Sequence, residues 1–159
     1  MRTRTRAITL IALLACALGV HFWLDAMPVI ERKSETYATA GDDGSLEVAG
    51  QRLTLRGAEW DEFPSPDGTR TVSIRLHSSG GAEAEVCGEV TLSEPGGRIW
   101  LDADDIVDVP SEEGEPYCVA ESAPYDIVTV FVVPDDADGP FVLTIADGAG
   151  RAARFDIAF

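Results

Sequence analysis

The hydrophobic residues of this chain follow two different patterns, one after the other. Residues 7–24 form a single run without a charged side chain. As a helix rising about 1.5 Å per residue, this run would span roughly 27 Å, close to the thickness of the hydrocarbon core of a bilayer. From residue 41 onward, apolar and polar residues alternate in short runs between glycine, proline and aspartate, as in β-strands and turns. We therefore predict a transmembrane helix over 7–24 and an all-β domain over 41–159.

The charges beside the apolar run indicate its orientation. Three arginines lie within residues 1–6, and basic residues remain on the cytoplasmic side of a membrane span. We therefore expect a cytoplasmic N-terminus, a signal anchor over 7–24 and an extracytoplasmic domain. Residues 25–40 are predicted to form a tether between the two, since Pro28 interrupts a helix and residues 31–40 are polar without an apolar period.

Two other interpretations of the N-terminus remain open, and both involve cleavage near Cys16. The basic start and apolar core also fit a cleaved secretory signal. Residues 13–16 (LLAC) resemble a bacterial lipobox, in which Cys16 would be lipidated and become the mature N-terminus. The apolar run continues to Leu24, which favours an uncleaved anchor because a cleavage site is usually followed by polar residues. All three interpretations place the domain outside the cytoplasm.

The period-two pattern predicts eight strands, in the ranges 45–49, 51–60, 69–77, 83–92, 98–102, 126–133, 141–146 and 151–159. A change of parity at Gly57 predicts a β-bulge in the second strand. Residues 102–121 form the longest irregular stretch, and residues 126–133 are apolar on both faces, as in a buried central strand. No helical period of useful length appears after residue 24. These features predict an antiparallel β-sandwich.

The alternation is clearest at 69–77, where inward and outward positions can be assigned. The apolar residues are predicted to face the interior of the sandwich: Val72, Ile74 and Leu76. The polar residues between them are predicted to face outward: Thr71, Ser73, Arg75 and His77.

Four motifs carry a family resemblance, the last three of them consecutive. Residues 97–100 (GRIW) follow a turn, and the apolar strand 127–134 (IVTVFVVP) leads through 135–140 (DDADGP) into 141–145 (FVLTI). These motifs resemble the telokin-like, immunoglobulin-like domains of small secreted or membrane-anchored bacterial proteins. The resemblance implies an immunoglobulin-like sandwich and lends no catalytic residues. The chain departs from that family in its cysteine pair and in its long acidic stretch.

The two cysteines of the domain predict a disulfide. The chain has three cysteines, and only Cys87 and Cys118 lie outside the apolar run. An exported domain with two cysteines is most simply read as having one disulfide between them. Closing a loop of this length contributes roughly 3–4 kcal/mol in the chain-entropy model. If the register of 83–92 holds, its parity places the disulfide on the outer face or rim of the sandwich, and a bulge at Gly88 would change this.

Net charge excludes some partners. From residue 41 onward, 25 acidic residues face 7 arginines, which gives the domain a charge of about −18. Nucleic-acid binding requires clustered basic residues, so we exclude it. An anionic lipid surface would also repel this domain.

The acidic stretch 102–113 is the first candidate for chemistry. Carboxylates stand at the first, third, seventh and twelfth positions of a calcium loop: Asp102, Asp104, Asp108 and Glu113. Val107 occupies the position where that loop needs glycine, so we expect a solvated acidic loop and no metal site. His77 is the only histidine of the domain, and one histidine on a polar face does not indicate a metal site or a catalytic triad. We expect no cofactor and no catalytic residue.

The aromatic loop after the second strand is the candidate for partner binding. Trp60 and Phe63 can act as buried anchors in an interface, with Asp61 and Glu62 orienting a basic partner. The alternative is that both aromatics cap the open end of the sandwich.

The sequence therefore predicts a non-enzymatic, membrane-tethered, extracytoplasmic immunoglobulin-like domain that binds a protein or cell-envelope partner. One alternative is an accessory subunit of a membrane complex, held through the span itself. Another is a cation-binding or envelope-hydrolysing domain that uses the stretch 102–113.

Overall fold

The computed structural model describes residues 36–41 and 43–159, and the range Thr36–Phe159 forms one compact unit. The predicted cytoplasmic segment 1–6, the span 7–24 and residues 25–35 of the tether lie outside the described residues. The described residues contain no helix that is long and apolar enough to cross a membrane.

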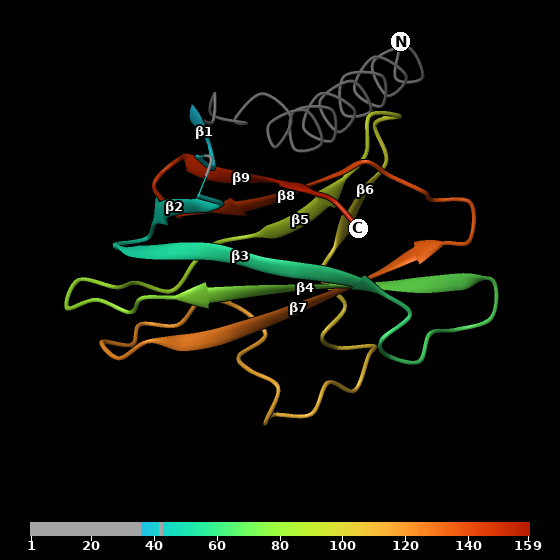
Figure 1. The fold of residues 1–159 in the computed structure, drawn as a ribbon, viewed down its shortest axis with the longest axis horizontal. Coiled ribbons are helices and arrows are strands. Elements are labelled where there is room, and N and C mark those ends of the chain that lie inside the picture. Colours follow the sequence, from blue (N-terminus) through green and yellow to red (C-terminus); the bar gives the residue numbers. More distant parts are fainter. Residues whose placement is uncertain (1–35, 42) are drawn as a thin grey trace, which may run out of the picture. The chain divides into compact units, whose positions relative to one another are not determined.

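Nine strands make up the described part of the chain (Figure 1). They are β1 (Thr36–Thr39), β2 (Ser45–Val48), β3 (Gln51–Trp60), β4 (Thr69–Ser78), β5 (Val90–Ser93), β6 (Ile99–Leu101), β7 (Tyr125–Pro134), β8 (Phe141–Ala146) and β9 (Arg151–Ile157). They form a five-stranded sheet in the order β1-β9-β8-β5-β6 and a four-stranded sheet in the order β2-β3-β4-β7. The all-β architecture of two mainly antiparallel sheets is confirmed.

The first strand differs from the prediction. β1 pairs in parallel with β9, in the register Thr36↔Arg151 to Thr39↔Arg154. These four residues belong to the stretch 25–40 that was assigned to the tether. All four are exposed and have no apolar alternation, so the hydrophobic pattern carries no signal for this edge strand.

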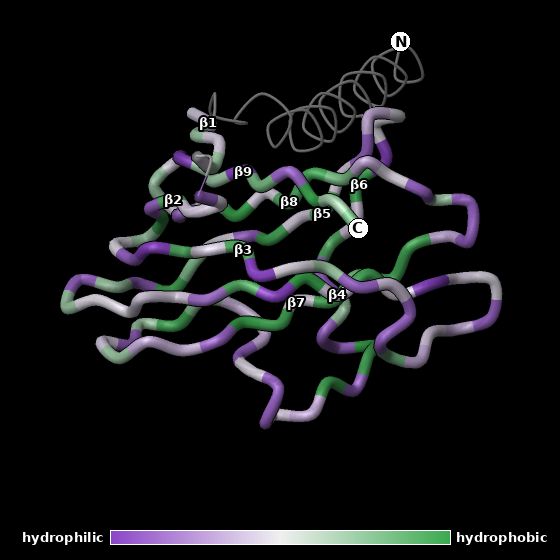
Figure 2. The backbone as a smooth tube through the Cα atoms, in the orientation of Figure 1, coloured by the Kyte–Doolittle hydropathy of each residue, from purple (hydrophilic) through white to green (hydrophobic). Residues whose placement is uncertain are grey.

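The main core lies between the two sheets. Its largest fully buried side chains include Phe131 on β7, Phe141 on β8 and Phe155 on β9. Val72, Ile74 and Leu76 of β4 are buried in the same core, as their alternation predicted. In Figure 2 green and purple segments alternate along the strands, as expected where one face of a strand packs into the core and the other does not.

The bulge predicted at Gly57 is confirmed. In the pairing of β3 with β4, Leu55 lies opposite Leu76 and Gly57 lies opposite Arg75, so Arg56 is the extra residue. An extra residue in one strand of a pair bends that strand and redirects its side chain.

The strand predicted over 83–92 is wrong in its first half. Only Val90–Ser93 forms β5, because the backbone of the preceding residues bonds to distant segments. The Glu85 amide donates to the Ala49 carbonyl at 2.8 Å, and the Gly88 amide donates to the Ala146 carbonyl at 2.8 Å.

The outer position expected for the disulfide is wrong for Cys118, whereas Cys87 is half-buried beside the core. Cys87 and Cys118 are paired, with Cα atoms 5.2 Å apart, and Cys118 is only 1% exposed within the main core. The expected rim position assumed that Cys87 lies in a regular strand, and the irregular backbone of 83–89 removes that parity.

A second small core lies on the outer side of the four-stranded sheet. The yellow-to-gold stretch between β6 and β7 runs along this side in Figure 1. Its Ala103 and Val107 pack against Val128 and Val130 of β7. This cover explains why β7 is apolar on both faces.

Candidate functional site

A polar network centred on Arg75 lies on the outer face of β4. The Arg75 guanidinium donates from Nη2 to the Glu113 carboxylate at 2.9 Å and also to the Glu62 carboxylate. Ser73, two residues earlier on the same face, donates its hydroxyl to Glu62. Two outward positions of β4 therefore bind both the turn after β3 and the acidic stretch.

Burial and hydrogen bonding act in opposite directions on Glu62. Partial burial raises its pKa, but hydrogen bonds from Ser73 and Arg75 outweigh this effect and lower the pKa below the ordinary 4.5. The hydrogen bond with Glu62 raises the pKa of Arg75, partly opposed by burial. These shifts describe an ion pair in which both partners remain charged.

The same face of the sheet opens into a cleft of about 440 Å³ beyond this network. His77 lies in it, with Nδ1 at 2.7 Å from Oδ1 of Asp126 on the neighbouring β7. The full lining is Arg56, Arg75, Leu76, His77, Glu113, Asp126, Ile127 and Val128. A cavity of this size is within the range of ligand sites, about 300–1,000 Å³.

The state of the arginines distinguishes this cleft from the rest of the surface. Five of the seven arginines in the described residues are ion-paired: Arg52 with Glu47, Arg70 with Asp61, Arg75 with Glu62 and Glu113, Arg98 with Glu94 and Asp136, and Arg151 with Asp147. Arg154 lies over the Tyr37 ring at 3.5 Å. Arg56 makes no ion pair or hydrogen bond with any described residue, although the domain contains 25 acidic residues. The β3 bulge supplies Arg56, and its side chain lines the cleft.

A larger depression near Gly50 contains no unpaired cation for a ligand. Its volume is about 540 Å³, but its cation Arg151 is already bound to Asp147, with Nε at 2.6 Å from Oδ2. Its other charged lining residues are acidic: Glu83 and Glu85. This depression therefore presents no unpaired group of opposite sign to the domain as a whole.

The disulfide and a buried polar cluster fix the end of the acidic stretch. Gln51 is 1% exposed and donates from Nε2 to the carbonyls of Glu85 at 3.0 Å and Val119 at 3.3 Å. Its Oε1 accepts from the Tyr125 hydroxyl at 2.7 Å. Gln51 therefore ties together the two segments that carry Cys87 and Cys118. The sequence pattern does not single out this residue, because an inward glutamine has no distinctive spacing.

The four residues predicted for partner binding are all engaged within the domain. Trp60 stacks on Phe159 with ring centroids 4.8 Å apart, and its other neighbours include Phe141 at 5.6 Å. Phe63 packs against the second small core. The structure therefore separates the two aromatics between different layers.

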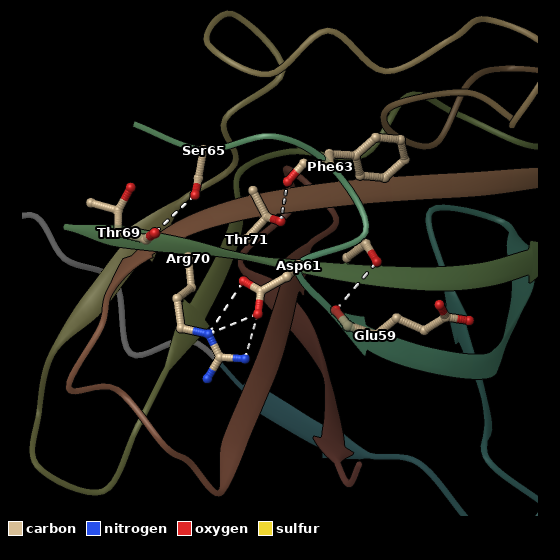
Figure 3. A network of polar contacts seen from close by, with 8 residues as sticks. Glu59, Asp61, Phe63, Ser65, Thr69, Arg70 and Thr71 are labelled. Carbon is tan, nitrogen blue, oxygen red and sulfur yellow. Dashed lines mark hydrogen bonds and ion pairs between the residues drawn. The ribbon is translucent and has the colours of Figure 1, made fainter. Parts of the chain in front are cut away.

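The turn after β3 explains this separation (Figure 3). Asp61 has a positive φ of 55° and binds Arg70, with Oδ2 at 2.6 Å from Nη2. Thr71 donates its hydroxyl to the Phe63 carbonyl at 2.8 Å. In Figure 3 the Asp61 carboxylate and the Phe63 ring point away from each other. Of the four residues, Asp61 and Glu62 point to arginines of the same domain.

The acidic stretch is used in part by the fold. Glu113, at the twelfth position of the sequence match to a calcium loop, binds Arg75. Burial raises the pKa of Asp102, and the neighbouring Asp104 raises it further through a hydrogen bond and like charge. Within residues 36–41 and 43–159, no three His, Cys, Asp or Glu side chains are grouped to hold a metal ion.

Sequence reasoning missed Arg56, Arg75 and Asp126 as members of one site. The spacing of Arg75 and His77 does place them on the same face of one strand. The pairing of β4 with β7, which brings Asp126 beside His77, links residues 49 positions apart and leaves no local signal.

No protein-family model, curated protein or solved structure matches this chain. The functional proposal therefore rests on the geometry of the cleft.

Proposed function

We propose that this chain is a membrane-tethered, extracytoplasmic immunoglobulin-like domain that binds a protein or cell-envelope partner through the cleft on its four-stranded sheet. The observation that carries the proposal is that Arg56 lines an open cleft without an ion pair or hydrogen bond among the described residues, whereas five of the other six arginines there are ion-paired. A guanidinium left without a partner among so many carboxylates is available to a ligand.

Two features support the immunoglobulin-like arrangement. The motif 127–145 that carries the family resemblance coincides with β7, the following turn and the start of β8. β7 and β8 belong to different sheets, so this motif connects the two layers of the sandwich. Both features concern the fold, and neither indicates a catalytic activity.

Two features support an extracytoplasmic position. The uncharged run 7–24 follows three arginines, as in a signal anchor. The paired cysteines fit an oxidising compartment, in which disulfides form and persist. A reporter active only in the cytoplasm, fused after Phe159, is expected to give no signal, and a strong signal would contradict this topology.

Photo-crosslinking of the full-length chain in its own cells tests the binding proposal. A photoreactive residue at Thr54, which pairs with His77 across β3 and β4, lies beside the cleft. A matched probe at Thr144 lies on β8 of the other sheet. We expect a discrete adduct from Thr54 and none from Thr144.

Two outcomes would overturn the proposal. The first is the absence of an adduct from Thr54 while the chain is present at its normal level. The second is an adduct that forms only from Thr144, because the partner would then use the five-stranded sheet.

A further inference from the structure

We propose that the cleft recognises a carboxylate group, with Arg56 and His77 as its ligands to that group. This inference rests on the proposed partner binding and names the chemistry that the partner must carry. The carboxylate can belong to an acidic side chain or to a C-terminus, since the group presented to the cleft is the same.

Arg56 provides the main interaction. A guanidinium binds the two oxygens of a carboxylate through parallel N–H donors, with a geometry that lysine cannot provide. The Arg56 side chain is exposed, comes from the bulge of β3 and lines the cleft. Because it has no ion pair within the described residues, a ligand does not have to displace an internal carboxylate.

His77 provides the second donor only in its doubly protonated form, because the Nδ1–H that faces Asp126 leaves Nε2 of the neutral ring as an acceptor. Its Nδ1 faces Oδ1 of Asp126 at 2.7 Å, which orients the ring and leaves Nε2 as the nitrogen for a ligand. When both ring nitrogens carry a proton, Nε2–H can donate to an anion. About one third of the His77 side chain is exposed, so the ring is reachable from solvent.

The cleft already contains one arginine that binds carboxylates. Arg75 binds two carboxylates of the same chain, those of Glu62 and Glu113. One lining arginine is thus saturated by internal carboxylates, and the other has none. An external carboxylate bound to Arg56 would give this arginine the ion pair that Arg75 already has.

The charge of the domain restricts the ligand further. A field from about −18 charges repels every anion, and the repulsion grows with the charge of the ligand. A singly charged carboxylate is therefore favoured over a doubly charged phosphate ester. The atoms around the carboxylate should be neutral or basic, because basic groups are attracted by the rest of the domain.

The two histidines of the chain provide a direct test. The full chain, with isotope-labelled histidine, is dissolved in a non-ionic detergent and titrated with three N-terminally acetylated peptides. NMR follows the signals of the His77 ring. One peptide has a free C-terminal carboxylate and no acidic side chain. The second has an amidated C-terminus and one glutamate, and the third replaces that glutamate by glutamine.

We expect the His77 signals to shift saturably with at least one carboxylate peptide and not with the glutamine peptide. The peptide that binds identifies the source of the carboxylate. Arg56→Gln should weaken binding by at least about tenfold, as the loss of a charge-assisted hydrogen bond implies. Arg52→Gln is the matched control, since Arg52 is exposed on the same strand and pairs with Glu47.

No saturable shift with either carboxylate peptide would overturn the proposal, as would equal affinity in the wild type and in Arg56→Gln. The two proposals fail separately. If the Thr54 probe gives its adduct while His77 ignores both carboxylate peptides, partner binding stands and carboxylate recognition is wrong.

Discussion

At the scale of single residues, Glu62 connects the turn after β3 to β4. Its side chain is 22% exposed and accepts hydrogen bonds from Ser73 and Arg75. Removing its charge leaves a largely buried guanidinium with one carboxylate fewer. We expect Glu62→Gln to lower the free energy of unfolding by about 1–3 kcal/mol near neutral pH.

This loss should depend on pH in a defined direction. The pKa of Glu62 is lowered in the folded state, so its ionised form stabilises the fold above the ordinary value of 4.5. That contribution disappears as the pH falls through the lowered pKa, because the protonated side chain then resembles glutamine. Urea unfolding between about pH 7 and about pH 2 should show the wild type and the variant converging.

The matched control is Glu47→Gln, in an exposed pair with Arg52. It should change stability by less than about 0.5 kcal/mol at any pH. A difference between Glu62→Gln and the wild type that stayed constant across the pH series would contradict the role given to Glu62.

The two aromatics of the predicted binding loop allow a second residue-scale test. Trp60 contacts Phe141 and Phe159, and Phe63 contacts the second small core. The double change Trp60→Ala with Phe63→Ala should therefore cost about 3–5 kcal/mol in thermal or urea unfolding.

Ile99→Ala is the control for this pair, because Ile99 is 65% exposed on the edge strand β6 and should cost less than about 1 kcal/mol. If the aromatic double change cost as little, the two rings would be surface anchors, as the docking hypothesis for this loop requires.

At the scale of elements, the disulfide ties the end of the irregular stretch 102–121 to the segment just before β5. Cys87 and Cys118 are separated by 31 positions, and Cys118 lies near the end of that stretch. Replacing both by alanine should lower the free energy of unfolding by roughly 3–4 kcal/mol. Cys16→Ala in the same chain should leave domain stability unchanged, since Cys16 is not part of the pair.

The disulfide change also tests the link between the stretch and the cleft. Glu113 lines the cleft and lies five positions before Cys118. A loss of stability below about 1 kcal/mol in the double variant would mean that the Gln51 cluster alone fixes the stretch.

Strands with strict alternation could be predicted, and irregular segments could not. The alternation in β4 predicts which of its residues are buried, and the continuous apolar run in β7 predicts burial of both its faces. Residues 83–89 imitate a strand, but their amides bond to Ala49 and Ala146, which lie far away in sequence. Thr71 and Ser73 face outward as predicted and are nevertheless fully buried, because distant segments cover that face.

At the scale of the whole molecule, the charge of about −18 acts on every cation in solution. Glu113 is bound to Arg75, and burial beside Asp104 raises the pKa of Asp102. We therefore expect millimolar calcium to raise the melting temperature only slightly, through screening, and magnesium to have the same effect. A large rise specific to calcium would establish a site in the stretch 102–113.

The candidate cleft is the feature of the molecule that the sequence alone predicts least. Its members come from the bulge of β3, the outer face of β4, the start of β7 and the acidic stretch. The bulge at Gly57 could be predicted, and the outward direction of Arg75 and His77 could be predicted as well. Their meeting with Asp126 depends on strand pairing across 49 positions, which no local pattern encodes.

The most direct test of partner binding through the cleft is the yield of the Thr54 photo-adduct in cells that carry the full-length chain. The wild type, Arg56→Gln and Arg52→Gln are compared at equal expression. We predict that Arg56→Gln reduces the yield, by up to about tenfold where the partner is scarce relative to its Kd, whereas Arg52→Gln retains it. An undiminished adduct in Arg56→Gln would contradict this prediction, because the unpaired arginine of the cleft would then have no part in binding the partner.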